Sequence, residues 1–189
     1  MRITGGKFRG RALTGPKDDR IRPTSDMVRQ AIFNVLAHND FGAGFTLEGS
    51  KALDLFAGTG ALGIEALSRG AKFCLFVDDN AQSRALIREN VEALNLTGAS
   101  KIWRRDATAL GPMAANANGP YNLVFLDPPY RQNLVPLALN SAREGGWLAP
   151  HAIAVAELAE DEEFTVPESF ALYGARSYGD TKVAFLIAP

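Results

Sequence analysis

The sequence predicts an α/β protein with a doubly wound, mostly parallel sheet, on three observations. Short apolar runs typical of buried strands alternate with stretches of helical period along most of the chain, as in βαβ units. The pattern Gly58-x-Gly60-x-x-Gly63 follows the first run and opens a helix, which is typical of the first strand-to-helix turn in such sheets. The 189 residues show no internal repeat, and this length fits one domain with a single core.

The individual elements follow from periodicity and from residues that start or stop them. The amino-terminal helix is expected to begin at Thr24 or Ser25, either of which can cap it, and its apolar stripe extends from Val28 to Leu36. The helix after the glycine turn covers 61–68 and closes at Gly70. The other expected helices are 81–94 and 132–142, and the expected strands are 51–56, 73–77, 101–105, 121–126, 152–157, 170–173 and 182–187.

Composition narrows the class of protein. Hydrophobic residues make up 47% of the chain and charged residues 22%, which is ordinary for a globular protein, and no apolar run reaches the length of a membrane helix. The amino terminus lacks an apolar signal region, so a cytoplasmic protein is expected. Cys74 is the only cysteine and lies in an apolar run, and His38 and His151 are far apart. We therefore expect no disulfide and no metal site.

Charge is distributed unevenly along the chain. Residues 1–30 contain eight basic and three acidic residues, so the rest of the chain is strongly acidic although the net charge is only −1. A basic arm at 1–22 on a body at 23–189 suggests contact with nucleic acid phosphate, and a solvated tail is the equally weighted alternative. The candidate nucleic-acid-binding residues are Arg2, Lys7, Phe8, Arg9, Arg11 and Arg22.

The glycine turn indicates a nucleotide site. Asp78 lies 20 residues after Gly58, where an acidic residue that binds a ribose diol is expected. Taken alone, this spacing favours NAD. Asp54, four residues before Gly58, argues against it because a carboxylate there repels a pyrophosphate and attracts an ammonium group.

Further carboxylates strengthen the preference for a cationic ligand. Asp106 ends the third expected strand, where it can accept a hydrogen bond from an adenine amine, and Asp127 ends the fourth. Carboxylates at successive strand ends form an acidic cleft, which suits the sulfonium cofactor S-adenosylmethionine better than an anionic dinucleotide. The candidate cofactor-binding residues are Asp54, Phe56, Ala57, Gly58, Thr59, Gly60, Asp78 and Asp106.

Asp127-Pro128-Pro129-Tyr130 is the candidate catalytic segment. The two prolines restrict the backbone, so Asp127 and Pro128 are held extended at the carboxyl end of a buried strand. Asp127 and the Pro128 carbonyl can accept hydrogen bonds from an amine, and Tyr130 offers a ring for stacking on a base. A proline-rich loop with no catalytic role is the structural alternative. Glu157, at the end of the fifth expected strand, either faces the cleft or is solvated.

At these residues the sequence resembles class I S-adenosylmethionine-dependent methyltransferases, and most closely the RsmD family, which methylates guanine N2 in bacterial small-subunit ribosomal RNA. The matching segments span nearly the whole chain in the family's order: Arg2-Ile-x-Gly-Gly-Lys-x-Arg-Gly-Arg11, Arg22-Pro-Thr-Ser-Asp26, Asp54-Leu-Phe-Ala-Gly-Thr-Gly-Ala-Leu-Gly63, Glu65-Ala-Leu-Ser-Arg69, Asp127-Pro-Pro-Tyr130 and Tyr178-Gly-Asp-Thr181. Asp78 is a departure, because many relatives carry glutamate there.

The resemblance implies a seven-stranded Rossmann-like methyltransferase sheet whose last strand is antiparallel. It also implies S-adenosyl-L-methionine as cofactor and ribosomal RNA as partner, within a partly assembled small subunit, and a monomeric enzyme. Three alternatives stay open on the sequence. They are an adenine-N6 DNA methyltransferase, an NAD-dependent oxidoreductase and a noncatalytic RNA-binding assembly factor.

Overall fold

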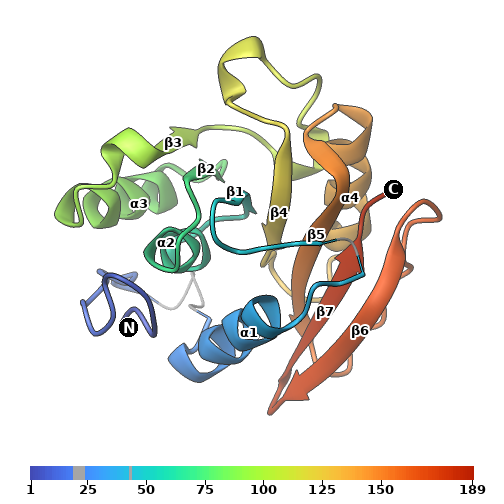
Figure 1. Cartoon of the computed structure of the whole chain (residues 1–189), viewed down its shortest axis with the longest axis horizontal. Helices are drawn as coiled ribbons and strands as arrows, with labels where there is room; N and C mark the ends of the chain where they lie inside the picture. The colour runs from blue at the N-terminus through green and yellow to red at the C-terminus, as the bar shows by residue number, and fades with distance from the viewer. Residues whose placement is uncertain (19–23, 43) are drawn as a thin grey trace.

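A computed structural model describes residues 1–18, 24–42 and 44–189. Its centre is a seven-stranded sheet of order β3-β2-β1-β4-β5-β7-β6 (Figure 1). The strands are β1 (Lys51–Leu55), β2 (Phe73–Val77), β3 (Ser100–Trp103), β4 (Tyr121–Leu126), β5 (Leu148–Ala159), β6 (Ala171–Tyr178) and β7 (Thr181–Ile187). The helices are α1 (Asp26–His38), α2 (Ala61–Ser68), α3 (Ala81–Ala93) and α4 (Leu134–Glu144). Short 3-10 turns are η1 (Thr97–Ala99), η2 (Ala107–Ala109) and η3 (Ala115–Ala117).

The sheet is doubly wound and mostly parallel, as the sequence predicts. β1 pairs in parallel with β2 on one side and β4 on the other, and β4 also pairs in parallel with β5. β7 is antiparallel to both β5 and β6, which confirms the expected antiparallel last strand. The chain order reverses between β1 and β4, and in open α/β sheets ligands bind at the carboxyl ends of the strands at this point.

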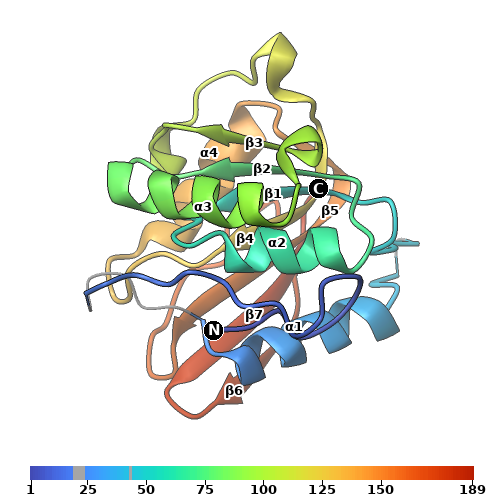
Figure 2. The ribbon, with the colours of Figure 1, turned by 90° about the vertical axis from the view of Figure 1, so that its left-hand side faces the viewer.

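Two cores cover the two faces of the sheet, because side chains alternate along each strand. Residues such as Cys74 and Phe125 pack with α1, α2 and α3, whereas Leu53 and Val124 pack on the other face with α4. Figures 1 and 2 show α1, α2 and α3 together on one side of the sheet. Cys74 is a fully buried core residue with a free thiol, as expected. Among the described residues no helix is long and apolar enough to span a membrane.

Residues 1–14 pack against the body and do not extend from it as an arm. Ile3 and Leu13 belong to the core that contains α1 and α2, and an isolated antiparallel bridge joins Arg2 to Ala12. Figure 2 shows this segment lying along α2 and above α1. The sequence predicts a basic arm or short hairpin here but not its packing on the body, because a segment rich in glycine and arginine gives no periodic apolar signal.

Candidate active site

The turn after β1 has a backbone that depends on glycine. Gly58 and Gly60 have φ angles of 60° and 81°, in the left-handed region that glycine adopts without strain. Phe56 has a φ of 58°, which is uncommon for a bulky residue and is found mostly at functional sites. A Cβ at Gly63 would lie 2.4 Å from Phe76 Cε1 and 2.6 Å from Cys74 Sγ. Gly63 therefore allows α2 to pack closely on β2.

Asp54 lies beneath this turn and is almost fully buried. Its Oδ2 accepts a hydrogen bond from the Gly63 N–H at 2.9 Å, so the carboxylate holds the first turn of α2 against β1. Burial raises the pKa of Asp54 well above its ordinary value. The hydrogen bond from the Gly63 N–H lowers this pKa, and the nearby Asp78 charge raises it further. A nearby cation stabilises the ionised form of such a carboxyl group.

Asp78 and Asp106 each organise the backbone at their own strand end. Asp78 Oδ2 accepts from the Gly58 N–H and Oδ1 from the Asn80 N–H, both at 2.9 Å. Burial raises the pKa of Asp78 despite these hydrogen bonds. Asp106 Oδ1 accepts from the Thr108 N–H and hydroxyl at 2.8 and 2.7 Å, which caps η2.

One pocket of about 440 Å³ connects these features, a size typical of small-molecule sites. It is lined by the predicted carboxylates Asp54, Asp78, Asp106 and Asp127, and by all of the other predicted cofactor residues except Gly60, which caps α2. The lining also includes Glu157, which the sequence left as either facing the cleft or solvated, and residues that the sequence did not place there, notably Thr24, Gln82, Ser83 and Arg105. Carboxylates thus outnumber cationic side chains in the described lining.

The predicted catalytic segment forms one wall of the pocket. Pro128 is buried, Asp127 and Tyr130 are half-buried, and Pro129 is exposed. The Tyr130 hydroxyl donates to Glu157 Oε1 at 2.8 Å and lies 3.1 Å from Thr181 Oγ1. Burial raises the pKa of Tyr130, which therefore stays protonated near neutral pH.

Glu157 and Thr24 are polar lining residues that contact the predicted catalytic segment; the sequence left Glu157 as either facing the cleft or solvated, and predicted Thr24 only as a possible helix cap. Glu157 is buried inside β5, which extends two residues beyond it. Ser25 caps α1 by accepting from the Val28 N–H, while the Thr24 hydroxyl contacts Asp127 Oδ2 at 2.9 Å and Glu157 Oε2 at 3.0 Å. The Thr-Ser pair before the helix signalled a cap but not which hydroxyl faces the pocket.

The candidate RNA-binding residues lie on a different surface. Arg2, Lys7, Arg9 and Arg11 are exposed, and the Lys7 Nζ lies 5.3 Å from the centre of the Phe8 ring. Phe8 is partly buried against the core, so only part of its ring is accessible for stacking. Arg22 lies outside the described residues.

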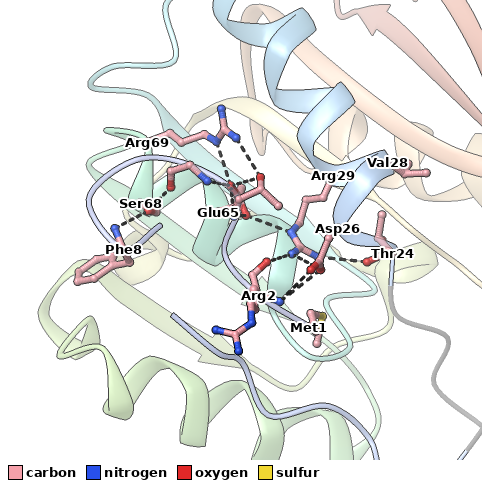
Figure 3. Close-up of polar contacts among 12 residues, drawn as sticks. Met1, Arg2, Phe8, Thr24, Asp26, Val28, Arg29, Glu65, Ser68 and Arg69 are labelled. Atoms are coloured by element: carbon pink, nitrogen blue, oxygen red, sulfur yellow. Dashed lines mark hydrogen bonds and ion pairs between the residues drawn. The ribbon is translucent and has the colours of Figure 1, made fainter. Parts of the chain in front are cut away.

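Arg29 is one of the eight basic residues of 1–30, but it does not lie on the surface. It is fully buried and pairs with the buried Glu65, with Arg29 Nε 3.1 Å from Glu65 Oε2 (Figure 3). Glu65 also accepts from the N–H groups of Thr4 and Gly5 at 2.9 to 3.0 Å. This pair ties the amino-terminal segment to α1 and α2, and Arg69 joins it through a 3.0 Å contact with Glu65.

Known proteins share this sequence and this fold. The model of the family described as Conserved hypothetical protein 95 matches residues 1–187. Ribosomal RNA small subunit methyltransferase D of Escherichia coli K12 is 36% identical over 181 residues, covering 95% of this chain and 85% of its own. The protein of that name in Haemophilus influenzae is 32% identical over 180 residues, covering 95% and 89%.

Solved structures with the same fold include proteins described as methyltransferases. The E. coli protein yhhF, described as a methyltransferase, superposes with a TM-score of 0.81 at 30% identity, covering 100% of this chain and 97% of its own. An RNA methyltransferase of Salinibacter ruber, solved with S-adenosyl-L-homocysteine, shares the fold at a TM-score of 0.60 and 14% identity, covering 89% of this chain and 94% of its own. The family match over nearly the whole chain and the curated relatives agree with the motifs, and the chain belongs to this family of RsmD-type methyltransferases.

Proposed function

We propose that the protein transfers a methyl group from S-adenosyl-L-methionine to the exocyclic N2 amine of a guanine in small-subunit ribosomal RNA. The observation that carries the proposal is that Asp127, Pro128 and Tyr130 line the same pocket as the Gly58 turn. The pocket thus offers a nucleoside site and an amine-binding segment side by side. Membership of the RsmD family supplies the reaction class, since the matching curated relatives are named as methyltransferases of ribosomal RNA.

The residues of the pocket fit this cofactor. Asp54, Asp78 and Asp106 provide carboxylates at three strand ends, and the turn at Gly58 provides a backbone that a ligand can approach closely. Asp78 would bind the ribose hydroxyls, Asp106 the adenine amine, and Asp54 the ammonium group, directly or through water. When bound, the cofactor supplies an activated methyl group on a sulfonium.

The chain's own residues then position the acceptor. Asp127 and the Pro128 carbonyl would accept the two hydrogens of the amine, which turns its lone pair toward the methyl group. Tyr130 would stack on the base, worth about 1–3 kcal/mol. Alignment of this kind lowers a barrier by ~7–11 kcal/mol, and Asp127 also lies where it can take up the proton that the amine loses. The base must leave its stack or lie in an unpaired loop to enter the pocket.

The resemblance to the RsmD family supports guanine over adenine as the base, because that family methylates guanine N2. The residues Asp127, Pro128 and Tyr130 in the pocket wall suit either exocyclic amine.

The exposed basic side chains of the described residues 1–18 would hold the RNA backbone around the flipped guanine. We propose a partly assembled small subunit as the natural substrate and a monomer as the active form. We propose that the segment 1–22 contacts RNA and that the body 23–189 carries out methyl transfer. Within the first segment, Ile3 and Leu13 pack into the core of the body.

One assay tests these points together. The protein is mixed with naked small-subunit RNA, or with partly assembled subunits, and methyl-labelled cofactor, and the labelled nucleoside is identified. N2-methylguanosine is expected, with faster labelling of the particle. N6-methyladenosine would favour the alternative amine acceptor. RNA binding with no methyl label on the RNA would favour a noncatalytic assembly factor. Affinity for NAD in place of S-adenosyl-L-methionine would favour an oxidoreductase.

A further inference from the structure

A hydrogen-bond network lies behind the amine-binding wall, and the proposed reaction does not by itself require it. Thr24 Oγ1 donates toward Asp127 Oδ2 at 2.9 Å and toward Glu157 Oε2 at 3.0 Å. Glu157 Oε1 accepts from the Tyr130 hydroxyl at 2.8 Å. Both ends of the candidate catalytic segment, Asp127 and Tyr130, are thus connected to the buried Glu157.

The chemistry of the network makes it an orienting device. The Thr24 hydroxyl lies within hydrogen-bond distance of both carboxylates and carries one hydrogen, so it bridges Asp127 and Glu157. Hydrogen bonds to carboxylates are among the stronger ones in proteins, and Glu157 lies buried at 6% exposure, where such bonds are not diluted by water. The carboxylate of Asp127 and the ring of Tyr130 are therefore held relative to each other.

Thr24 itself is fixed from behind (Figure 3). Its backbone carbonyl accepts from Arg29 Nη1 at 3.1 Å, and Arg29 is locked by its buried ion pair with Glu65. This contact holds the backbone of Thr24, so its side-chain hydroxyl can still bond to Asp127 and Glu157. A residue just before α1 thereby reaches the ends of β4 and β5, which are far from it in sequence.

We infer that Thr24 and Glu157 are positioning residues that set the orientation of Asp127 and Tyr130 for the acceptor amine. This inference rests on the proposed methyl transfer for its kinetic consequences, but its geometric claim stands independently. Loss of the Thr24 hydroxyl would remove the hydrogen bonds that link the Asp127 carboxylate to Glu157, and would thereby change how Asp127 is oriented. A shift of about 1 Å in a positioning group is enough to cost ~100-fold in rate.

The decisive variant is Thr24→Val, which keeps the branched shape and removes the hydroxyl. We expect kcat to fall by ~100-fold, with an unchanged KM for RNA and an unchanged Kd for the cofactor. Thr24→Ser, which restores a hydroxyl, should recover most of the rate. Ser25→Ala is the matched control, because it removes the cap of α1 and lowers the melting temperature while leaving kcat unchanged. A wild-type rate for Thr24→Val would overturn the inference.

Glu157 is tested through its coupling to Thr24. Glu157→Leu should lower kcat, Glu157→Gln should lower it less because the amide still accepts from Tyr130, and Glu157→Leu with Thr24→Val should lose less than the product of the two single losses. Losses that multiply would show that the two residues act separately and would overturn the inference.

A crystal structure of Thr24→Val separates this inference from the proposed function. If the wild-type protein labels no guanine, the proposed function fails, and the orientation of Asp127 then decides the inference alone. A rotated Asp127 carboxylate or a shifted Tyr130 ring supports it. Both side chains in their wild-type positions would overturn it, whatever the protein's reaction.

Discussion

Asp127 is the residue with the most direct role in the proposed methyl transfer. It is half-buried in the pocket wall, and its Oδ2 is held by Thr24 at 2.9 Å. Asp127→Ala removes an acceptor for the amine, so kcat should fall by ~100-fold or more, the scale expected of a lost positioning or proton-accepting group. Affinity for the cofactor should stay unchanged in calorimetry, because the glycine turn and the other aspartates remain.

Asp161→Ala is the matched control for this change. Asp161 is also paired, with Arg131 at 2.6 Å, but that pair is on the surface with Asp161 69% exposed. Exposed pairs contribute little to stability, so this variant should turn over at the wild-type rate. Equal rates for the two aspartate variants would remove Asp127 from the mechanism.

The raised pKa values of Asp54 and Asp78 give the pocket a pH dependence. Burial is the main cause for both, so in the free protein each becomes protonated at a higher pH than the ordinary 3.8. Only the ionised form attracts a cation. Affinity for S-adenosylmethionine should therefore be complete above these raised pKa values and decline as the pH falls through them, and binding there should release protons.

Calorimetry in buffers of different ionisation enthalpy measures both effects. Asp54→Asn keeps an acceptor for the Gly63 N–H and removes the charge, so its affinity should be weaker at neutral pH and vary less with pH. An affinity that rises as the pH falls would contradict a role for these carboxylates in attracting the cation.

Residues were predictable where a local pattern specified them. The four aspartates could be identified because each lies at or just after the end of an expected strand, and strand ends of a parallel sheet converge. Thr24 was not identified as a pocket residue and Glu157 was left as facing the cleft or solvated, because their roles come from contacts across 103 to 133 residues of sequence. No local pattern encodes such pairings.

At the scale of elements, the packing of α2 on the sheet depends on one glycine. The Cβ added by Gly63→Ala would overlap Phe76 and Cys74 at 2.4 to 2.6 Å, inside a core without spare volume. We expect a loss of about 1–3 kcal/mol in the free energy of unfolding, typical of overpacking. Chemical denaturation measures this, and Gly98→Ala is the control because nothing lies within 4 Å of the added carbon.

Helix and strand positions were predicted well where one face is buried and poorly where none is. The expected helix 61–68 and strand 73–77 have the observed bounds. β6 extends to Tyr178, five residues beyond the expected end, and most of its residues are exposed. An edge strand exposed on both faces has no apolar alternation, so its length is set by its pairing with β7.

At the scale of the whole molecule, composition predicted a charge asymmetry but not how the basic segment is held. Glu65 lies in a helical stretch whose sequence indicates only helix, yet it is buried and binds Arg29, Thr4 and Gly5. Removing either Arg29 or Glu65 would leave an uncompensated buried charge, which typically costs ~3–5 kcal/mol. Deleting residues 1–11 keeps this ion pair but removes the buried Ile3 and the Thr4 and Gly5 N–H donors to Glu65. The deletion would therefore destabilise the body and confuse folding with RNA binding.

Single surface substitutions avoid that problem and test the basic segment directly. Arg9 is exposed, so Arg9→Ala should weaken RNA binding about equally for all sequences. If Arg9 contacts one phosphate, the slope of log affinity against log salt should fall by about 0.7 to 0.9. Arg176→Ala is the control, since Arg176 is exposed on the edge strand β6, outside the basic segment, and its slope should match the wild type. An unchanged slope for Arg9→Ala, with unchanged affinity, would exclude this residue from the RNA interface, because a released counterion must appear in the salt dependence.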